Sequence, residues 1–298
     1  MKVSSLLFAV VTLILVISLL SVWFYPSVQD FMASNTMWNG VRSFSDNVSA
    51  DNIESLDELP SLPKQAVLVA IPYLDYTDAE LLKIKQFLAD GGTLLLMDDY
   101  GYGNTVLAYL GVGVRFSNQP LLDPLFNYKN QLMPRITDFA SELKESGIAT
   151  IVLNHATSLT NVEPAKVIAW SSTASFLDTN ENGSWDGGEL KGPFVVAAEL
   201  RLGQGTLALV ADPSIMINSM VGRDDNYGFI RYLTRRGDEQ EEVLVDNSHL
   251  TKMPLDVSKT RVTGGREMLS SPYALLGITA LIFVVVSRYT IKKGGNID

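Results

Sequence analysis

The residues with the most informative chemical spacing lie in one acidic stretch, Asp178–Glu189, which reads DTNENGSWDGGE. Its pattern, D-x-N-x-N-G-x-x-D-x-x-E, places hard oxygen donors at the liganding positions of a twelve-residue calcium loop. Gly183 stands at the sixth position, where the sharp turn strains a residue that carries a Cβ. The spacing therefore predicts a Ca²⁺ site, and the alternative is an acidic surface turn. The predicted ligands are Asp178, Asn180, Asn182, Ser184 through its backbone carbonyl, Asp186 and Glu189.

A second group of polar residues follows the predicted strands of a parallel sheet. Ligands of open α/β sheets bind beyond the carboxyl ends of the strands, so these residues predict a polar pocket for a small molecule or a peptide. The alternative is that Asp98 or Asp99 caps a helix and that Asp212 and Asn218 hold turns. The candidate pocket residues are Asp98, Asp99, Asn104, Asp212, Ser214 and Asn218.

Residues suited to covalent catalysis are scarce. The chain has no cysteine, which excludes disulfides, cysteine nucleophiles and thiolate metal sites. Neither of its two histidines, His155 and His249, stands in a recognisable nucleophile–base pattern. Asp246 and Ser248 are close to His249 in sequence, but a catalytic triad requires convergence in space. We therefore expect no catalytic residue, and the alternative is a hydrolase that uses acidic residues at the carboxyl edge of the sheet.

Apolar runs and capping signals place these residues on an α/β framework. Residues 66–71 (AVLVAI) and 93–97 (TLLLM) are short continuous apolar runs, typical of buried parallel strands. Between them, Thr77 and Glu80 form a capping-box pattern before a helix that ends at Gly91-Gly92. Later strands are predicted at 148–153, 166–171, 194–200 and 206–211, the last two as a hairpin. A last helix, capped by Asp225 or Asn226, is predicted to run through Arg236.

Two apolar segments predict membrane spans. Leu6–Phe24 is uncharged and, at ~1.5 Å per residue, long enough for a ~30 Å hydrocarbon core. Because no A-x-A cleavage site follows it, an uncleaved signal anchor is favoured over a cleaved signal peptide. A shorter run, Tyr273–Val286, predicts the second span. Basic residues flank both spans on their outer ends, which places both termini in the cytoplasm and residues 26–270 outside it, in a two-pass protein of the cell membrane.

The predicted organisation follows from these elements. The net charge of -10 and the isoelectric point of about 4.7 argue against nucleic acid as a partner. The expected segments are an anchor (1–25), a polar lead-in (26–65), an α/β domain (66–236) with the inserted calcium loop 178–189, a juxtamembrane extension (237–270), a second span (271–288) and a cytoplasmic tail (289–298).

Several motifs give the chain a resemblance to a known family. They are TMWNG at 36–40, GGTLLLMDDYGYGN at 91–104, SFLDTNENGSWDGGE at 175–189, and ADPSIMIN at 211–218 with DN at 225–226. The chain resembles membrane-anchored domains of unknown function whose fold is similar to that of class I glutamine amidotransferases. The resemblance spans about residues 30–235 and implies a flavodoxin-like three-layer α/β sandwich with a mostly parallel sheet. Glutamine hydrolysis does not carry over, because the amidotransferase nucleophile is a cysteine.

These observations together predict a non-catalytic extracytoplasmic domain, accessory or ligand-binding, anchored in the membrane. The resemblance adds a protein partner in a membrane complex, such as a transport or cell-envelope system. A strand rather than a helix leads into the calcium loop, and no second loop pairs with it. We therefore expect the bound Ca²⁺ to be structural rather than regulatory.

Overall fold

The computed structural model of the protein describes residues 3–60, 66–235 and 242–259, together with Arg261, Leu276 and Thr279. The chain divides into two compact units. One consists of Met1–Tyr25 and Lys252–Asp298, and the other of Pro26–Thr251. The candidate binding residues all belong to the second unit.

The first unit contains one long apolar helix, α1 (Val3–Phe24). Its segment Leu6–Phe24 is long and apolar enough to cross a membrane, and no other helix among the described residues is. Such a helix fits a membrane anchor or a signal sequence. The predicted second span, 271–288, lies outside the described residues except for Leu276 and Thr279, and the tail 289–298 lies wholly outside them.

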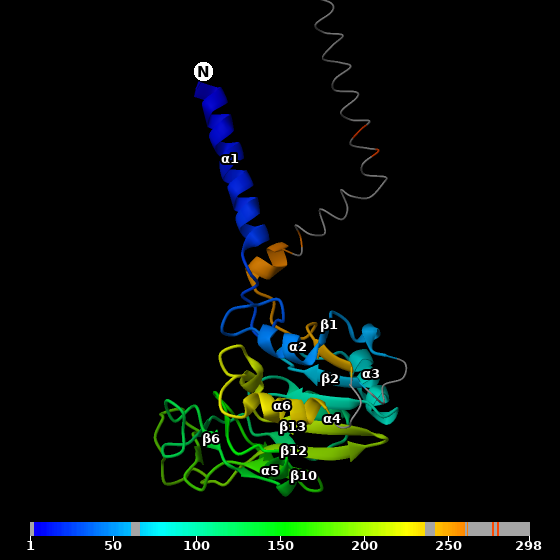
Figure 1. Ribbon diagram of the computed structural model, residues 1–298, viewed down its shortest axis with the longest axis vertical. Helices are drawn as coiled ribbons and strands as arrows, with labels where there is room; N and C mark the ends of the chain where they lie inside the picture. Colours follow the sequence, from blue (N-terminus) through cyan, green and yellow to red (C-terminus); the bar gives the residue numbers. More distant parts are fainter. Residues whose placement is uncertain are drawn as a thin grey trace, which may run out of the picture. The chain divides into compact units, whose positions relative to one another are not determined.

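The second unit is built on a mixed, largely parallel sheet (Figure 1). Five neighbouring strands run parallel to one another, and the remaining strands extend the sheet in antiparallel pairs. In spatial order the strands are β1 (Asp51–Ile53), β14 (Glu242–Asp246), β2 (Ala66–Ala70), β3 (Thr93–Met97), β13 (Gly205–Val210), β12 (Val195–Leu202), β10 (Lys166–Trp170) and β7 (Asp138–Phe139). Strand β9 (Leu159–Thr160) also pairs with β12, and β4 (Arg115–Phe116) pairs with β9.

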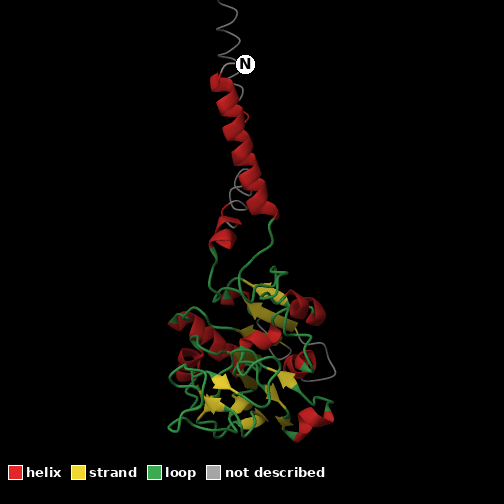
Figure 2. Ribbon diagram, turned by 90° about the vertical axis from the view of Figure 1, so that its left-hand side faces the viewer, coloured by secondary structure: helices red, strands yellow, loops and turns green. Residues whose placement is uncertain are grey.

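Helices cover both faces of this sheet, which explains why β2, β3 and β13 are apolar at nearly every position and buried throughout (Figure 2). Side chains alternate between the faces with a period of two. Leu68 and Leu94 pack on the side of α3 (Asp78–Ala89) and α4 (Gly103–Tyr109). Val67 and Leu95 pack on the opposite side. The helices of that side are α2 (Arg42–Val48), α5 (Ser141–Glu145) and α6 (Asn226–Thr234).

The local predictions in the centre of the chain are confirmed. Strands β2 and β3 form as predicted, and α3 begins at the expected capping box, in which Thr77 and Glu80 exchange hydrogen bonds. Strands β12 and β13 form the predicted hairpin around residues 203–204. The result is an α/β fold in which the carboxyl ends of β2, β3, β13 and β14 lie at one edge of the sheet.

The predicted domain boundaries, 66–236, are too narrow at both ends. Residues 242–246, expected in a juxtamembrane extension, form β14 inside the sheet, between β1 and β2. Residues 26–65, expected as a lead-in, contain α2, β1 and the 3₁₀ helix η1 (Leu56–Glu58). A three-residue apolar core, Val243–Val245, is too short to identify a strand, and its pairing partners are distant in sequence.

Two small two-stranded sheets flank the large one. Strand β5 (Leu121–Leu122) pairs with β11 (Phe176–Leu177), and β6 (Arg135–Ile136) pairs with β8 (Ile151–Val152). Strand β11 leads directly into the predicted calcium loop, and the Asp178 N–H donates to the Pro120 carbonyl at 2.9 Å. The loop therefore begins beside the chain at Pro120.

Candidate functional site

The first acid after β3, Asp98, organises the turn into α4. Its carboxylate accepts backbone N–H bonds from Asp99 (2.9 Å), Gly101 (2.8 Å) and Gly103 (2.7 Å). A Cβ on Gly103 would lie 2.6 Å from Asp98 Oδ2, so this close approach requires glycine. Burial raises the pKa of Asp98 to about 6, although the N–H bonds of Gly101 and Gly103 favour its charged form. Asp98 therefore holds the turn into α4.

Asp99 faces a partly buried tyrosine, Tyr73. The Tyr73 hydroxyl lies 3.3 and 3.4 Å from the two carboxylate oxygens, and the Tyr100 N–H donates to Oδ1 at 2.6 Å. Burial raises the pKa of Asp99 against the effect of these bonds. Burial also raises the pKa of Tyr73, and the charges of Asp99, Asp212 and Asp98 raise it further. The charges of all three acids thus raise the pKa of one phenol.

Asp212 follows β13 and caps the 3₁₀ helix η3 (Pro213–Met216). It is completely buried, and it accepts N–H bonds from Ser214 (2.7 Å) and Asn154 (2.6 Å). Burial, opposed by the Asn154 bond and assisted by the charge of Asp99, raises the pKa of Asp212 well above its usual value. Within the described part of the chain, no hydrogen bond joins the carboxyl groups of Asp98, Asp99 and Asp212 to one another.

The remaining predicted pocket residues also have structural contacts. Asn104 exchanges two hydrogen bonds of 2.9 Å with the backbone of Phe116. Ser214 gives its N–H to the cap of η3. Asn218 Oδ1 accepts the Ser43 N–H at 2.8 Å, and its amide donates to the chain before α2. The six residues gather near the carboxyl edge of the sheet. The side chains of all except Ser214 form hydrogen bonds to backbone groups, and none of the six lines the cavity described next.

A cavity of about 380 Å³ lies beside this edge. Sequence reasoning missed most of its lining because Gln131 and Leu132 belong to an irregular segment without periodicity. The Gln131 amide donates to the Gly183 carbonyl at 2.6 Å, and the Leu132 carbonyl accepts the His155 N–H at 2.8 Å. These two bonds join the segment to the calcium loop and to the residues after β8. The lining residues are Tyr100, Pro120, Leu122, Gln131, Leu132, His155, Asp178, Glu181 and Gly183.

The predicted calcium loop is folded as a tight acidic turn. Asp178, 2% exposed, accepts N–H bonds from Asn182 (3.1 Å) and Gly183 (2.8 Å). Gly183 has a φ of +74°, which confirms the predicted need for glycine there. The Glu189 carboxylate closes the loop by accepting the N–H groups of Thr179 (2.8 Å) and Asp186 (3.0 Å). The first and last predicted ligands therefore already point into the turn.

The middle ligands meet at Asp186. The amide nitrogens of Asn180 and Asn182 each lie 2.7 Å from Asp186 Oδ2. Among the described residues, no group of three or more His, Asp or Glu side chains is arranged to hold a metal ion. Oxygen donors of the type and number that Ca²⁺ requires are nevertheless present in one loop. For the amide oxygens to face a cation, both bonds to Asp186 must break and the two amides must rotate.

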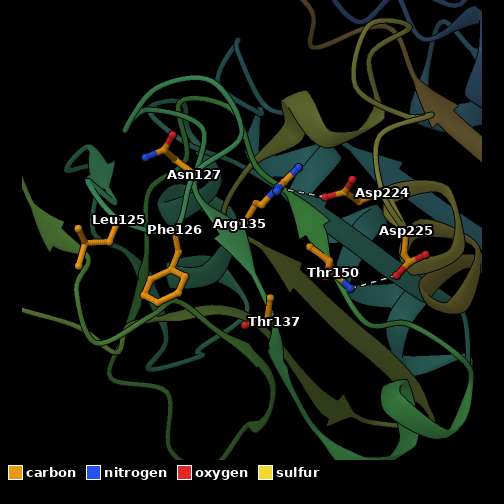
Figure 3. Close-up of a pocket in the computed structure, with 8 residues that line it drawn as sticks. All are labelled: Leu125, Phe126, Asn127, Arg135, Thr137, Thr150, Asp224 and Asp225. Carbon is orange, nitrogen blue, oxygen red and sulfur yellow. Dashed lines mark hydrogen bonds and ion pairs between the residues drawn. The ribbon is translucent and has the colours of Figure 1, made fainter.

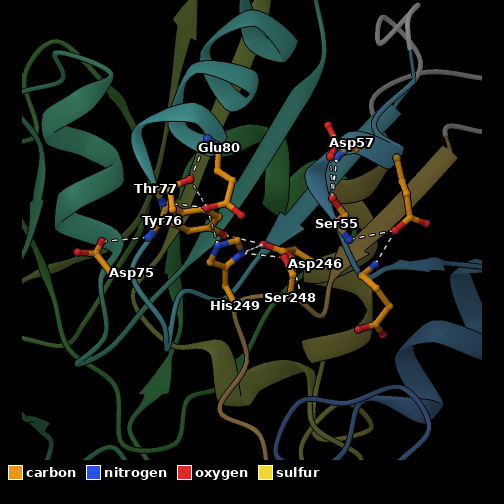
Figure 4. A network of polar contacts seen from close by, with 11 residues as sticks. Ser55, Asp57, Asp75, Tyr76, Thr77, Glu80, Asp246, Ser248 and His249 are labelled. Atoms are coloured by element: carbon orange, nitrogen blue, oxygen red, sulfur yellow. Dashed lines mark hydrogen bonds and ion pairs between the residues drawn. The ribbon is translucent and has the colours of Figure 1, made fainter. Parts of the chain in front are cut away.

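The second histidine lies in a separate buried network (Figure 4). His249 stacks on Tyr76 with ring centroids 3.6 Å apart, and its Nδ1 lies 2.7 Å from Asp246 Oδ2. Ser248 Oγ approaches the same nitrogen at 2.9 Å, whereas Nε2 faces Glu80 at 3.6 Å. A serine protease triad places the serine and the aspartate on opposite ring nitrogens. The network therefore lacks triad geometry, and it joins the end of β14 to the start of α3.

A further open cavity, of about 580 Å³, lies between β6, β8 and the start of α6 (Figure 3). Arg135 Nε pairs with Asp224 at 3.3 Å. Asp225 accepts the N–H groups of Ala149 (2.9 Å) and Thr150 (3.0 Å). Asp224 and Asp225 thus both have hydrogen-bond or ion-pair partners. Asp225, which precedes α6, accepts backbone N–H groups from outside the helix and does not cap it. The lining residues are Leu125, Phe126, Asn127, Arg135, Thr137, Thr150, Asp224 and Asp225.

Solved structures with a similar chain path share little sequence with this protein. The N-terminal domain of mmIFT52 is 16% identical, with a TM-score of 0.48, over 67% of this chain and 92% of that one. The cytoplasmic protein STM1381 from Salmonella typhimurium LT2 is 16% identical, with a TM-score of 0.38, over 63% and 74%. A β-galactosidase from Bacillus circulans sp. alkalophilus is 15% identical, with a TM-score of 0.35, over 56% and 22%. These likenesses assign no activity.

The sequence itself matches no curated protein of known function. It does match a family model, described as a domain of unknown function (DUF4350), over residues 33–234. The matched range is more than half of the chain, and it includes the acids that follow β3 and β13, the cavity and the predicted calcium loop. The protein therefore belongs to the DUF4350 family.

Proposed function

We propose that the protein is a membrane-tethered, non-catalytic ligand-binding domain in which Ca²⁺ fixes one wall of the binding cavity. The observation that carries this proposal is the shared lining of the 380 Å³ cavity. Tyr100 and His155 reach it from the loops after β3 and β8, and Asp178 and Gly183 reach it from the predicted calcium loop. A cation that orders the loop would thus also shape the cavity.

The loop supports Ca²⁺ by its donor set and by its existing turn. Asp178 and Glu189 accept one or more backbone hydrogen bonds on each carboxylate oxygen, and a carboxylate oxygen has a second lone pair for a cation. The amide oxygens of Asn180 and Asn182 accept the N–H groups of Asn182 and Ser184, and the two side chains would have to rotate to bring both oxygens to one cation. Because the loop starts from strand β11 and contacts Gln131, the Ca²⁺ in our proposal is structural.

The cavity also indicates the class of ligand. Leu122, Leu132 and the Tyr100 ring supply apolar surface, and Gln131 and His155 supply polar groups. Pockets of this mixed kind hold small organic molecules by burying apolar groups and orienting polar ones. The volume suits a small molecule or a single peptide side chain.

We propose that the domain is non-catalytic because its acidic residues at the sheet edge already bind backbone groups. A hydrolase at the sheet edge needs carboxyl groups that converge on a substrate. Asp98 and Asp212 instead each accept two or more backbone N–H groups, and these bonds fix the turn into α4 and the start of η3. Asp99 contacts the Tyr73 hydroxyl, and Asp212 has the Ser214 hydroxyl as a neighbour, but no hydrogen bond joins the two carboxyl groups among the described residues.

The proposal includes a fold and a location. Helices on both sides of the sheet support the flavodoxin-like, class I glutamine amidotransferase-like sandwich. The apolar α1 supports a membrane tether, with Pro26–Thr251 outside the cytoplasm, both termini inside it and a membrane-complex protein as partner. Extracellular Ca²⁺ would then be available to a weak loop of this kind.

The test is a fragment screen by saturation-transfer NMR on the full chain in lipid nanodiscs, with millimolar Ca²⁺ or with EDTA. Ligands of the cavity should bind about tenfold more weakly in EDTA and in Leu132→Trp, which fills the cavity. Leu200→Trp, at a partly buried position outside the cavity lining, should leave binding unchanged. If Leu132→Trp leaves ligand binding unchanged, the cavity is not the binding site. Hydrolysis of an ester, amide or phosphoester that Asp99→Asn abolishes would establish the hydrolase instead.

A further inference from the structure

A loop at the start of the α/β unit exposes two large apolar side chains to solvent. We name residues 26–41 the entry loop, because they connect α1 to α2. Trp38 is 66% exposed and Met37 is 38% exposed, whereas Phe31 and Val41, in the same loop, are buried. Exposing a tryptophan to water is unfavourable, and neither the proposed cavity nor the calcium loop involves this residue.

The entry loop is held from within by one asparagine. Asn35 is completely buried, and its amide donates to the Gln29 carbonyl at 2.8 Å. Its Oδ1 accepts the Met37 N–H, also at 2.8 Å. A Cβ on Gly40 would lie only 2.0 Å from the Asn35 carbonyl oxygen, so the chain passes itself too closely for any other residue.

The same loop is held from outside by the turn after η3. The Asn218 amide donates to the Met37 carbonyl at 2.6 Å, and the Asn218 N–H donates to the Gly40 carbonyl at 2.7 Å. The Ser219 N–H donates to the Trp38 carbonyl at 3.0 Å. The backbone that carries the exposed pair, Met37 and Trp38, is therefore fixed on both sides. A fixed loop with an exposed tryptophan is typical of a contact surface.

The entry loop lies at the carboxyl edge of the sheet. Phe31 stacks on Tyr73, just beyond β2, with ring centroids 5.4 Å apart. The other end of the unit leaves from the same edge, since His249, just beyond β14, accepts the Leu74 N–H at 2.9 Å. Both chain ends of the α/β unit thus emerge where the candidate site lies.

The chain length limits how far the entry loop can be from the end of α1. Tyr25, the last residue of the first unit, is six residues from Phe31. Six residues span at most about 20 Å when fully extended. Trp and Tyr are enriched where proteins cross the boundary between lipid and water, and Trp23 and Tyr25 at the end of α1 fit that preference.

We propose that the entry loop rests on the membrane surface, with Met37 and Trp38 in the lipid headgroup region. The inference rests on the membrane tether of the proposed function. The exposed apolar pair then lies in lipid rather than in water.

The cysteine-free sequence gives a direct test, because a single introduced cysteine is the only thiol in the chain. Met37→Cys and Leu190→Cys carry a nitroxide in the full chain, reconstituted in nanodiscs. Leu190, 66% exposed, lies just beyond the calcium loop and is the matched control. Electron paramagnetic resonance compares collisions with lipid-soluble oxygen and with a water-soluble nickel chelate. The ratio of oxygen to nickel collisions should be several-fold higher at position 37 than at 190.

A second measurement uses native residues. Brominated lipids should quench part of the tryptophan fluorescence, and Trp38→Phe should remove part of the quenched signal while Trp185→Phe leaves it intact. Equal collision ratios at 37 and 190, or quenching unchanged by Trp38→Phe, would overturn the inference. Alkaline carbonate extraction of the same chain tests the tether separately. A chain that leaves the membrane on extraction would refute the tether, whereas an integral chain with a water-exposed entry loop would refute only the docking.

Discussion

Replacing Glu189 with Gln should remove the thermal stabilisation that Ca²⁺ gives to the protein. Glu189 is the closing ligand of the predicted loop, and its two oxygens reach the N–H groups of Thr179 (2.8 Å) and Asp186 (3.0 Å). Glutamine keeps one oxygen and loses the charge, so it cannot bind Ca²⁺ through two oxygens. The loop is largely exposed, so without Ca²⁺ the substitution should change the free energy of unfolding by only about 0.5 kcal/mol.

The size of the effect follows from binding linkage. At a free Ca²⁺ concentration of one hundred times Kd, binding stabilises the folded state by about 2.7 kcal/mol. For a domain of 150–250 residues this corresponds to a rise in Tm of roughly 5–11 °C. If Glu189→Gln weakens binding about a hundredfold, the same Ca²⁺ concentration leaves about 0.4 kcal/mol, or a rise of roughly 1–2 °C.

The assay is differential scanning fluorimetry of the full chain in nanodiscs, with EDTA as the reference and Mg²⁺ as the competing cation. Glu181→Gln is the matched control, because it removes the same charge from the same loop at a position without a predicted ligand role. Glu181→Gln should retain the full rise in Tm that Ca²⁺ gives to the wild type. The reasoning is refuted if the wild type shows no rise in millimolar Ca²⁺. If both variants lose the Ca²⁺-induced rise in Tm equally, the loss comes from removing a negative charge and not from removing a ligand.

Two further predictions concern stability. In EDTA, the free energy of unfolding should fall as pH rises from about 4 to 6, by up to ~3 kcal/mol from Asp98 alone. The folded-state pKa of Asp98 is about 6 and those of Asp99 and Asp212 are also raised, so the folded state binds more protons than the unfolded state in this range. Urea unfolding at constant ionic strength measures this, and a stability that rises over the same range would contradict it. His249→Ala should destabilise the protein by about 3–5 kcal/mol, because it leaves the buried Asp246 carboxylate without its imidazole partner. The exposed His155→Ala should cost at most about 0.5 kcal/mol, and equal urea midpoints for the two variants would show that the network contributes no stability.

Local patterns were sufficient where neighbouring residues in sequence decide the structure. The capping box of Thr77 and Glu80, the apolar runs of β2 and β3 and the hairpin of β12 and β13 depend on contacts within or between adjacent segments. The same holds for the turn at Gly183, where the Asp178 carboxylate binds N–H groups four and five residues ahead.

Long-range contacts decided what the sequence left open. Strand β14 is short and follows an acidic segment, and it is recognisable only because β1 and β2 pair with it on either side. Asn218 was expected in a pocket, yet its hydrogen bonds run to residues 35–43, more than 170 positions away. No local pattern contains that information.

The sequence by itself determined the α/β class, the apolar N-terminal helix, the oxygen-rich loop and the lack of a cysteine nucleophile, because residue type and short spacing fix each of them. Only the tertiary structure decided that the carboxyl groups of Asp98 and Asp212 bind backbone, that His249 is buried against Asp246, and that Gln131 and His155 share a cavity with the loop. The physical reason is that a side chain's role depends on which groups satisfy its hydrogen bonds. In this protein, the partners that decide those roles lie mostly on other strands and loops of the fold.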